Sequence, residues 1–246
     1  MKNIDLSNYQ LTSFIDDLKD LNIILNEIQL CQFMRYYELL VEWNQVMNLT
    51  AITDFDEVLK KHFIDSLSLV KAYNDFFSKS LIDIGTGAGF PGIPLKIAFP
   101  ELKVTLLDSL NKRVNFLQTV IGELGLKDIE ALHGRAEDYS KKEIFREKFD
   151  LCVSRAVANL STLSEYCIPF VKVGGSFIPY KSGKISEEID EAKKAISIFG
   201  GKIENQIEFI IPGSDIYRNL IVIDKIEKTP DKYPRKAGMP AKNPII

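Results

Sequence analysis

A glycine-rich segment at residues 84–92 is the part of the chain best suited to bind a ligand for chemistry. It reads IGTGAGFPG and continues a short apolar run that contains Asp83. Glycines let the backbone turn sharply and approach a ligand without an intervening Cβ atom. Backbone amides at the start of a following helix would add positive partial charge. The segment therefore predicts a binding loop between a strand and a helix, with candidate contacts at Gly85, Gly87 and Gly89.

Asp83 bears on the kind of ligand that this loop would bind. Gly87, Gly89 and Gly92 match the dinucleotide pattern GxGxxG, which is weak evidence alone. A carboxylate beside the loop would repel a pyrophosphate but would suit a ligand with a cationic amino-acid head, such as S-adenosylmethionine. Pro91 also lacks the amide that a pyrophosphate could use. These residues favour S-adenosylmethionine over a nicotinamide dinucleotide.

Two more polar positions follow later apolar runs. Asp108 ends the second run, about twenty residues after the loop, where a carboxylate can bind the ribose hydroxyls of either cofactor. Residues 134–138 follow the third run and could contact the adenine amine. Each feature alone fits a plain turn or a helix cap equally well. In this order, at successive strand ends, they favour an adenosine-containing cofactor.

The elements that must position these residues differ between the two ends of the chain. Residues 1–78 contain no Gly or Pro, and apolar residues recur at helical spacing over 11–21, 33–43 and 58–67. Asp54 and Glu57 form a candidate capping box before the last of these stretches. We therefore expect an N-terminal helical region, 1–78, packed on a core domain, 79–246.

From residue 79 onward, short apolar runs alternate with amphipathic segments, of which 114–124 is the clearest. This alternation predicts an α/β fold with a mostly parallel, doubly wound sheet. A turn at 212–215 separates the last two runs and predicts an antiparallel hairpin at one edge. The seven expected strands are Leu81–Ile84, Val104–Leu107, Ile129–Leu132, Phe149–Val153, Ser176–Tyr180, Ile207–Ile211 and Leu220–Ile223.

Composition limits the class of protein. The chain has 246 residues, 46% of them hydrophobic, with 31 basic and 34 acidic residues and a formal charge of -3. This excludes a mostly disordered chain and a uniformly basic nucleic-acid coat. Three separated cysteines and two histidines predict reduced thiols and no metal site. The chain lacks a run of about 20 apolar residues and a signal-peptide pattern, so we expect a cytoplasmic protein with no membrane contact.

The last fifteen residues form a basic segment without an acid. Several prolines and one glycine disfavour a regular helix there. This composition fits an extended tail that binds RNA phosphates, but it fits equally a disordered tail or one folded back over the sheet. The candidate RNA-binding residues are Lys232, Arg235, Lys236 and Lys242.

Residues 83–95, DIGTGAGFPGIPL, resemble the small-subunit ribosomal RNA guanine-N7 methyltransferases, also called glucose-inhibited division protein B. The likeness extends in order over almost the whole chain, through WN at 43–44, NLT at 48–50, HFIDSL at 62–67, LDSLNKR at 107–113, SRA at 154–156 and PRKAGMP at 234–240. It implies a Rossmann-like methyltransferase fold with S-adenosylmethionine as cofactor. By motif match it places Gly85, Phe90, Ala136, Glu137 and Arg155 at cofactor-binding positions.

The same resemblance implies N7 of one guanine in 16S ribosomal RNA as the target. Because N7 already carries an in-plane lone pair, we expect no catalytic acid or base. N7 lies in the deep groove of A-form RNA, so the target must be in an open region. We expect a monomer that acts on 16S RNA or on a small-subunit assembly intermediate. A small-molecule methyltransferase of the same fold, a nicotinamide-dependent oxidoreductase and a non-catalytic RNA-binding protein are the alternatives.

Overall fold

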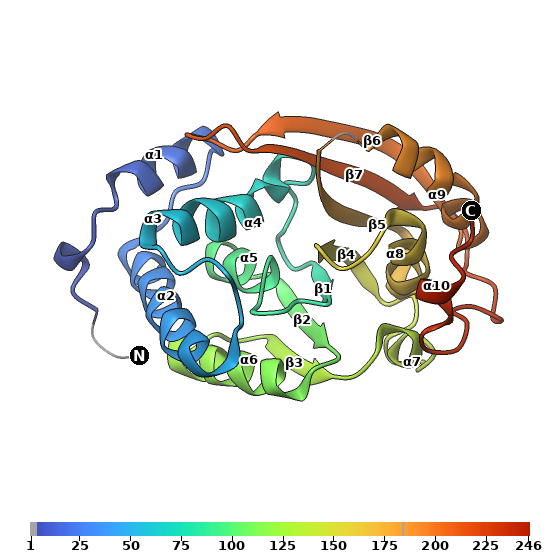
Figure 1. Ribbon diagram of the computed structural model, residues 1–246, viewed down its shortest axis with the longest axis horizontal. Coiled ribbons are helices and arrows are strands. Elements are labelled where there is room, and N and C mark those ends of the chain that lie inside the picture. Colours follow the sequence, from blue (N-terminus) through green and yellow to red (C-terminus); the bar gives the residue numbers. More distant parts are fainter. Residues whose placement is uncertain (1–3, 184) are drawn as a thin grey trace.

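One seven-stranded sheet runs through the computed structural model, which describes residues 4–183 and 185–246 (Figure 1). The strand order is β3-β2-β1-β4-β5-β7-β6. The first five strands pair in parallel, whereas β7 pairs antiparallel with both β5 and β6. The strands are β1 Ser80–Ile84, β2 Lys103–Asp108, β3 Ile129–His133, β4 Phe149–Arg155, β5 Val171–Ser182, β6 Gly201–Ile210 and β7 Tyr217–Lys225.

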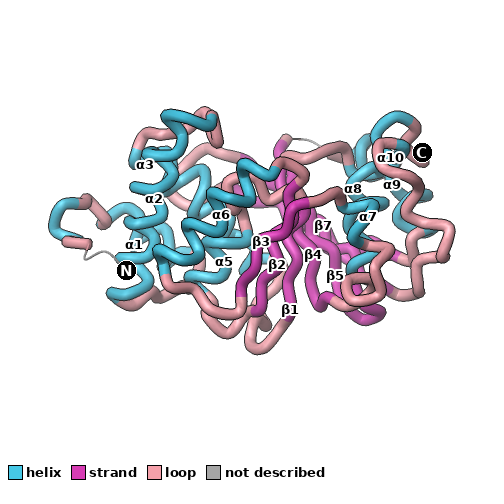
Figure 2. Tube along the Cα trace, turned by 90° about the horizontal axis from the view of Figure 1, so that it is seen from below, coloured by secondary structure: helices cyan, strands magenta, loops and turns pink. Residues whose placement is uncertain are grey.

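Helices cover both faces of this sheet, as Figure 2 shows. In β1, Leu81 faces the core shared with the N-terminal helices, whereas Ile82 and Ile84 face a second core. This alternation follows from the two-residue period of a strand. The first face is covered by α1 Thr12–Asp20, α2 Glu27–Met47, α3 Phe55–Val58, α4 Asp65–Leu67, α5 Gly92–Ala98 and α6 Asn111–Leu124. The second is covered by α7 Ala136–Tyr139, α8 Leu160–Cys167 and α9 Ser186–Ile198.

The N-terminal helices begin at clear capping signals. Asn26 caps α2 in a capping box with Gln29, and the Asp54 side chain accepts a hydrogen bond from the Glu57 amide at the start of α3. A π-helical stretch, Leu59–Ile64, joins α3 to α4. Phe33 and Phe63 pack at 5.0 Å between ring centroids inside the same core as the sheet. The proposed division at residue 78 therefore separates two sequence regions that share one core, and it stays a prediction.

The predicted α/β class and all seven expected strands are confirmed. The turn at 212–215 joins β6 and β7 at the sheet edge, as expected. The structure adds that β7, rather than β6, lies next to β5. The carboxyl ends of the parallel strands meet at one edge of the sheet, which is where the glycine-rich loop lies.

Candidate functional site

The glycine-rich loop joins the carboxyl end of β1 to α5. The φ angles of Gly85 and Gly87 are +69° and +63°, a region that residues with a side chain rarely adopt. A Cβ atom on Gly85 would meet the Val157 side chain at 2.6 Å. A Cβ atom on Gly87 would have no neighbour nearer than 4.0 Å and would enter a cavity. The two glycines thus keep the loop close to β4 on one side and open on the other.

Asp83 lies fully buried beneath this loop. Its Oδ2 accepts hydrogen bonds from the Gly92 amide at 2.9 Å and from the Thr86 hydroxyl at 2.7 Å. Its Oδ1 has no hydrogen-bond partner among the described residues. Burial raises the pKa of the Asp83 carboxyl group to about 6. The carboxylate therefore holds the loop in shape from inside and keeps one oxygen free for a further donor.

Asp108 holds the same loop from the neighbouring strand. Its Oδ2 accepts from the Gly87 amide and its Oδ1 from the Leu110 amide, both at 2.9 Å. The side chain is 2% exposed, and the Arg113 guanidinium lies 3.4 Å from Oδ2. To bind a ribose, the Asp108 carboxylate would have to release some of these partners and accept from the ribose hydroxyls instead. The contact between Asp108 and a ribose therefore stays a prediction.

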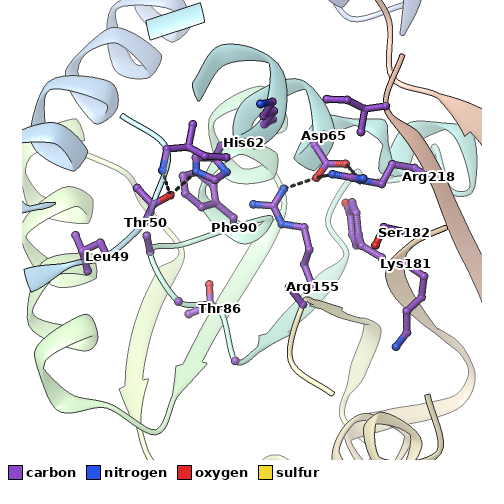
Figure 3. Close-up of a pocket in the computed structure, with 18 of the residues that line it drawn as sticks. Leu49, Thr50, His62, Asp65, Thr86, Phe90, Arg155, Lys181, Ser182 and Arg218 are labelled. Carbon is purple, nitrogen blue, oxygen red and sulfur yellow. Dashed lines mark hydrogen bonds and ion pairs between the residues drawn. The ribbon is translucent and has the colours of Figure 1, made fainter. Parts of the chain in front are cut away.

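A first cavity of about 740 Å³ opens between this loop and the N-terminal helices (Figure 3). Phe90 forms part of its wall, with the His62 ring stacked on it at 4.5 Å and the Arg155 guanidinium 5.2 Å from its centroid. The His62 Nε2 atom lies 2.8 Å from the Thr50 hydroxyl. Burial and the nearby Arg155 lower the pKa of His62 to about 4, so its imidazole is neutral at pH 7. The wall thus presents flat, uncharged rings beside one guanidinium.

A buried carboxylate fixes that guanidinium. Asp65 Oδ2 lies 2.8 Å from Nη1 of Arg155, and its Oδ1 accepts from Nε of Arg218 at 2.9 Å. The Asp65 side chain is 2% exposed. Because one carboxylate binds both arginines, the two cations are held at fixed positions on the cavity wall. Arg155 is therefore already paired, which fits a role at the cofactor edge better than a role at a developing positive charge.

A second cavity of about 410 Å³ lies on the other side of the loop, where the ends of β1 to β4 meet. Residues 134–137 form one wall, with Ala136 and Glu137 9% and 4% exposed. Gly85 lines both cavities. A long ligand crossing the loop at Gly85 would therefore occupy both, which suits a molecule with a nucleoside at one end and an amino-acid group at the other.

The C-terminal segment does not have the extended conformation that its composition predicted. Arg235 forms a bidentate ion pair with Glu165, and Gly238 donates its amide to Glu137 Oε1 at 2.8 Å. The segment ends in a short helix, α10 Met239–Lys242, which packs on α8. The extended-tail prediction is wrong because two buried carboxylates, Glu165 on α8 and Glu137 on α7, bind the tail back onto the domain. Arg235 is paired with Glu165, and an RNA contact by Arg235 stays a prediction.

The three tail lysines, Lys232, Lys236 and Lys242, are exposed. Of the predicted cofactor residues, Gly85, Gly87, Phe90 and Arg155 line the first cavity, and Gly85, Ala136 and Glu137 line the second. Asp83, Gly89 and Asp108 stand behind these walls. Gly89 has a φ of +101° and its amide donates to the Thr86 carbonyl at 2.9 Å, so it shapes the loop turn.

Sequence reasoning missed several residues of the site. His62 and Asp65 belong to the stretch HFIDSL at 62–67. This stretch matched the family pattern, but no cofactor-binding role was inferred for either residue. Arg218 lies on β7, 153 positions from the carboxylate that it binds, and nothing local in the sequence marked it. Tyr36 also escaped notice, although its buried hydroxyl donates to the Ala88 carbonyl inside the loop.

No group of His, Cys, Asp and Glu side chains within 4–183 and 185–246 could hold a metal ion. Over the same residues, no helix combines the length and the apolar character that crossing a bilayer requires.

Known proteins resemble this chain in sequence. A family model described as rRNA small subunit methyltransferase G matches residues 29–214. The ribosomal RNA small subunit methyltransferase G of Lachnoclostridium phytofermentans is 57% identical over 235 residues, which cover 96% of this chain and 97% of that protein. The protein of the same name from an Exiguobacterium species is 51% identical, covering 96% of this chain and 99% of the relative.

Solved structures share the fold at low sequence identity. An S-adenosylmethionine-dependent methyltransferase from Aquifex aeolicus superposes with a TM-score of 0.52 at 17% identity, covering 72% of this chain and 96% of that one. TYW2 of M. jannaschii, solved in complex with AdoMet, gives a TM-score of 0.51 at 16% identity, with 63% and 73% covered. These neighbours show that the chain has the methyltransferase fold.

Proposed function

The chain belongs to the rRNA small subunit methyltransferase G family, and from that premise we propose that it transfers a methyl group from S-adenosylmethionine to N7 of a guanine in 16S ribosomal RNA. The observation that carries the proposal is the glycine-rich loop at the end of β1, which separates two cavities that meet at Gly85. The smaller second cavity can hold the adenosine part of the cofactor, and the larger first cavity can hold its amino-acid part and the target base.

The residues present fit S-adenosylmethionine. The second cavity, with Ala136 and Glu137, has the size and the strand-end position for the adenosine part. Gly87 leaves the first cavity open for the amino-acid part, and the free Oδ1 of buried Asp83 supplies an unmatched negative charge beneath the loop. Asp108, after exchange of partners, would bind the ribose hydroxyls. The bound cofactor would supply an electrophilic methyl group.

This chain's contribution to the reaction is to align the two reactants. Because guanine N7 attacks with its own lone pair, no side chain has to remove a proton, and we assign no catalytic acid or base. Alignment of this kind contributes about 7–11 kcal/mol to a barrier reduction in favourable cases. The stacked rings of His62 and Phe90, with the Arg155 guanidinium beside them, give the first cavity a flat wall next to the loop against which a planar base can lie. Pairing of Arg155 with Asp65 reduces its repulsion of the positive charge that the purine gains.

The charge around the first cavity supports RNA as the substrate. The chain carries a formal charge of -3, yet the residues that line this cavity include five basic and two acidic side chains, and the basic groups still outnumber the acids when the ion-pair partners Glu57 and Asp108 are counted. A local excess of positive charge favours phosphate binding. Three exposed tail lysines add to the proposed RNA surface. The basic residues of the cavity are Lys61, Arg113, Arg155, Lys181 and Arg218, and the acids are Asp65 and Glu188.

We also propose that the protein acts as a monomer in the cytoplasm, on free 16S RNA or on an assembly intermediate. The substrate is tested by incubating the protein with methyl-labelled cofactor and small-subunit RNA from cells that lack this activity. N7-methylguanosine is then located by borohydride reduction and aniline cleavage of the RNA. We expect label at one guanine and a single cleavage. Label in small molecules but not in RNA would favour the small-molecule alternative, and a Gly87→Val variant serves as the inactive control.

A further inference from the structure

The C-terminal segment forms part of the wall of the second cavity. Gly238 and Ala241 line this cavity together with the ends of β1, β2 and β3. In Figure 1 the segment, with α10, lies beside α8 near the carboxyl ends of these strands. The remaining walls include the side chains of Leu107, Arg135, Val157 and Tyr166 as well as Gly85 and Ala136. Without the C-terminal segment this side of the cavity would be open to solvent.

One buried carboxylate fastens the segment. Glu165, on α8, is 1% exposed, and it accepts from the backbone amide of Arg235 at 2.7 Å as well as from the guanidinium at 2.6–3.0 Å. The remaining Nη1 of Arg235 donates to the Asn243 carbonyl at 2.8 Å, which ties the two ends of the segment together. The Arg235 side chain is 25% exposed, but separating the pair would leave the buried Glu165 carboxylate without its cationic partner, so the pair holds the segment firmly.

A second carboxylate joins the segment to the cavity itself. Glu137 is 4% exposed, and its Oε1 accepts from the Gly238 amide at 2.8 Å. Gly238 has a φ of +82°, which brings this amide onto the carboxylate. Glu137 therefore lines the cavity and also binds the C-terminal segment.

We propose that residues 235–242 are a structural wall of the adenosine subsite, and that Arg235 is a positioning residue that sets cofactor affinity through Glu165 and Glu137. The ligand class is an adenine nucleoside, and the inference rests on the proposed function. Arg235 itself does not face the cavity. Arg235 instead holds in place the backbone that lines the cavity, at Gly238 and Ala241. The segment therefore acts on cofactor binding through this backbone, and the exposed lysines of the tail have no part in this role.

Binding calorimetry with S-adenosylhomocysteine tests the proposal on three full-length variants. Gly238→Ala places a side chain at a positive φ but in open space, so its strain is confined to the segment. Gly125→Ala is the matched control, because Gly125 has a φ of +63°, is equally free of neighbours, and ends α6 at the opposite end of the strands. Arg235→Ala removes the fastening itself. We expect the dissociation constant to rise at least threefold for Gly238→Ala and at least tenfold for Arg235→Ala, and to stay within twofold for Gly125→Ala.

Hydrogen exchange gives a second readout that does not depend on how the variants fold. By linkage, a ligand that the segment helps to bind must also stabilise the segment. We expect S-adenosylhomocysteine to slow amide exchange over 235–243 in the wild-type protein. Unchanged exchange there, or a Gly238→Ala variant that binds as tightly as Gly125→Ala, would overturn the inference. If the wild-type protein binds the cofactor with this protection but methylates no small-subunit RNA, the proposed function fails while the inference stands.

Discussion

Substitution of Asp83 by Asn tests the electrostatics of the loop most directly. The carboxyl group is fully buried, and its pKa is raised to about 6 from the usual 3.8, mainly by desolvation. Between these two values the folded protein retains a proton that the unfolded chain has already lost. Folding stability therefore falls as the pH rises through this window, because the native state binds more protons than the unfolded state.

The magnitude follows from the shift. A difference of about two pKa units corresponds to about 3 kcal/mol of stability lost above pH 7, with no discount for solvent because the group is buried. About 2 kcal/mol of this loss falls between pH 4.5 and pH 7.5. Asn cannot ionise and avoids the loss. Its amide nitrogen, however, would take the place of the unpartnered Oδ1 and leave a buried donor unsatisfied, at a cost of about 1–3 kcal/mol at every pH.

Urea unfolding from pH 4.5 to pH 7.5 measures this difference. The stability of Asp83→Asn relative to the wild type should improve by about 2 kcal/mol across the range. Asp20→Asn, at an exposed acid on α1, controls for the loss of one surface charge. If the difference in the free energy of unfolding between Asp83→Asn and the wild type does not change with pH, the Asp83 carboxyl group does not have the raised pKa that its burial implies.

Cofactor binding connects the same carboxylate to function. The uncompensated charge of Asp83 should favour a ligand with a cationic head, so at pH 7.5 the variant should bind S-adenosylmethionine about tenfold more weakly, or about 1.4 kcal/mol. As the pH falls below 6, wild-type affinity should approach that of the variant. Equal affinities at pH 7.5 in calorimetry would show that Asp83 only shapes the loop.

Gly87→Val should abolish most methyl transfer while shifting the melting temperature only slightly, because its side chain enters the open cavity and strains a φ of +63°; normal turnover would place the site elsewhere. Asp65→Asn removes the carboxylate shared by two arginines and should destabilise the protein by about 3 kcal/mol in urea unfolding; unchanged stability would mean that the cluster is loosely solvated. Replacing Lys236 and Lys242 by Ala should flatten the salt dependence of RNA binding by up to about two units; an unchanged slope would exclude both lysines from RNA contact.

The strands and the loop could be predicted because their signals are local. Each apolar run is bounded by turn residues, and the glycines that need positive φ lie within five positions of one another. The helix that starts after Asp54 was also predictable, since a capping side chain acts on an amide three residues away. In such cases neighbouring residues carry the physical cause, and no distant partner has to be known.

The remaining features depend on partners that are far apart in the chain. Arg235 and Glu165 are 70 positions apart, and an acid-free basic tail looks the same whether it binds RNA or a single buried carboxylate. The order of β7 and β6 is likewise a matter of packing across the sheet and not of either strand's pattern. The sequence predicted ligand contacts for Asp83 and Asp108, but it did not indicate that both carboxylates accept hydrogen bonds from backbone amides of the loop.

These distant contacts give the loop its shape before any ligand arrives. Asp83 binds it from beneath, Asp108 binds it from β2, and the Tyr36 hydroxyl binds it from an N-terminal helix. A loop with several glycines would otherwise sample many conformations, and ordering it would oppose ligand binding. The N-terminal helices therefore contribute to the shape of the glycine-rich loop as well as to the core.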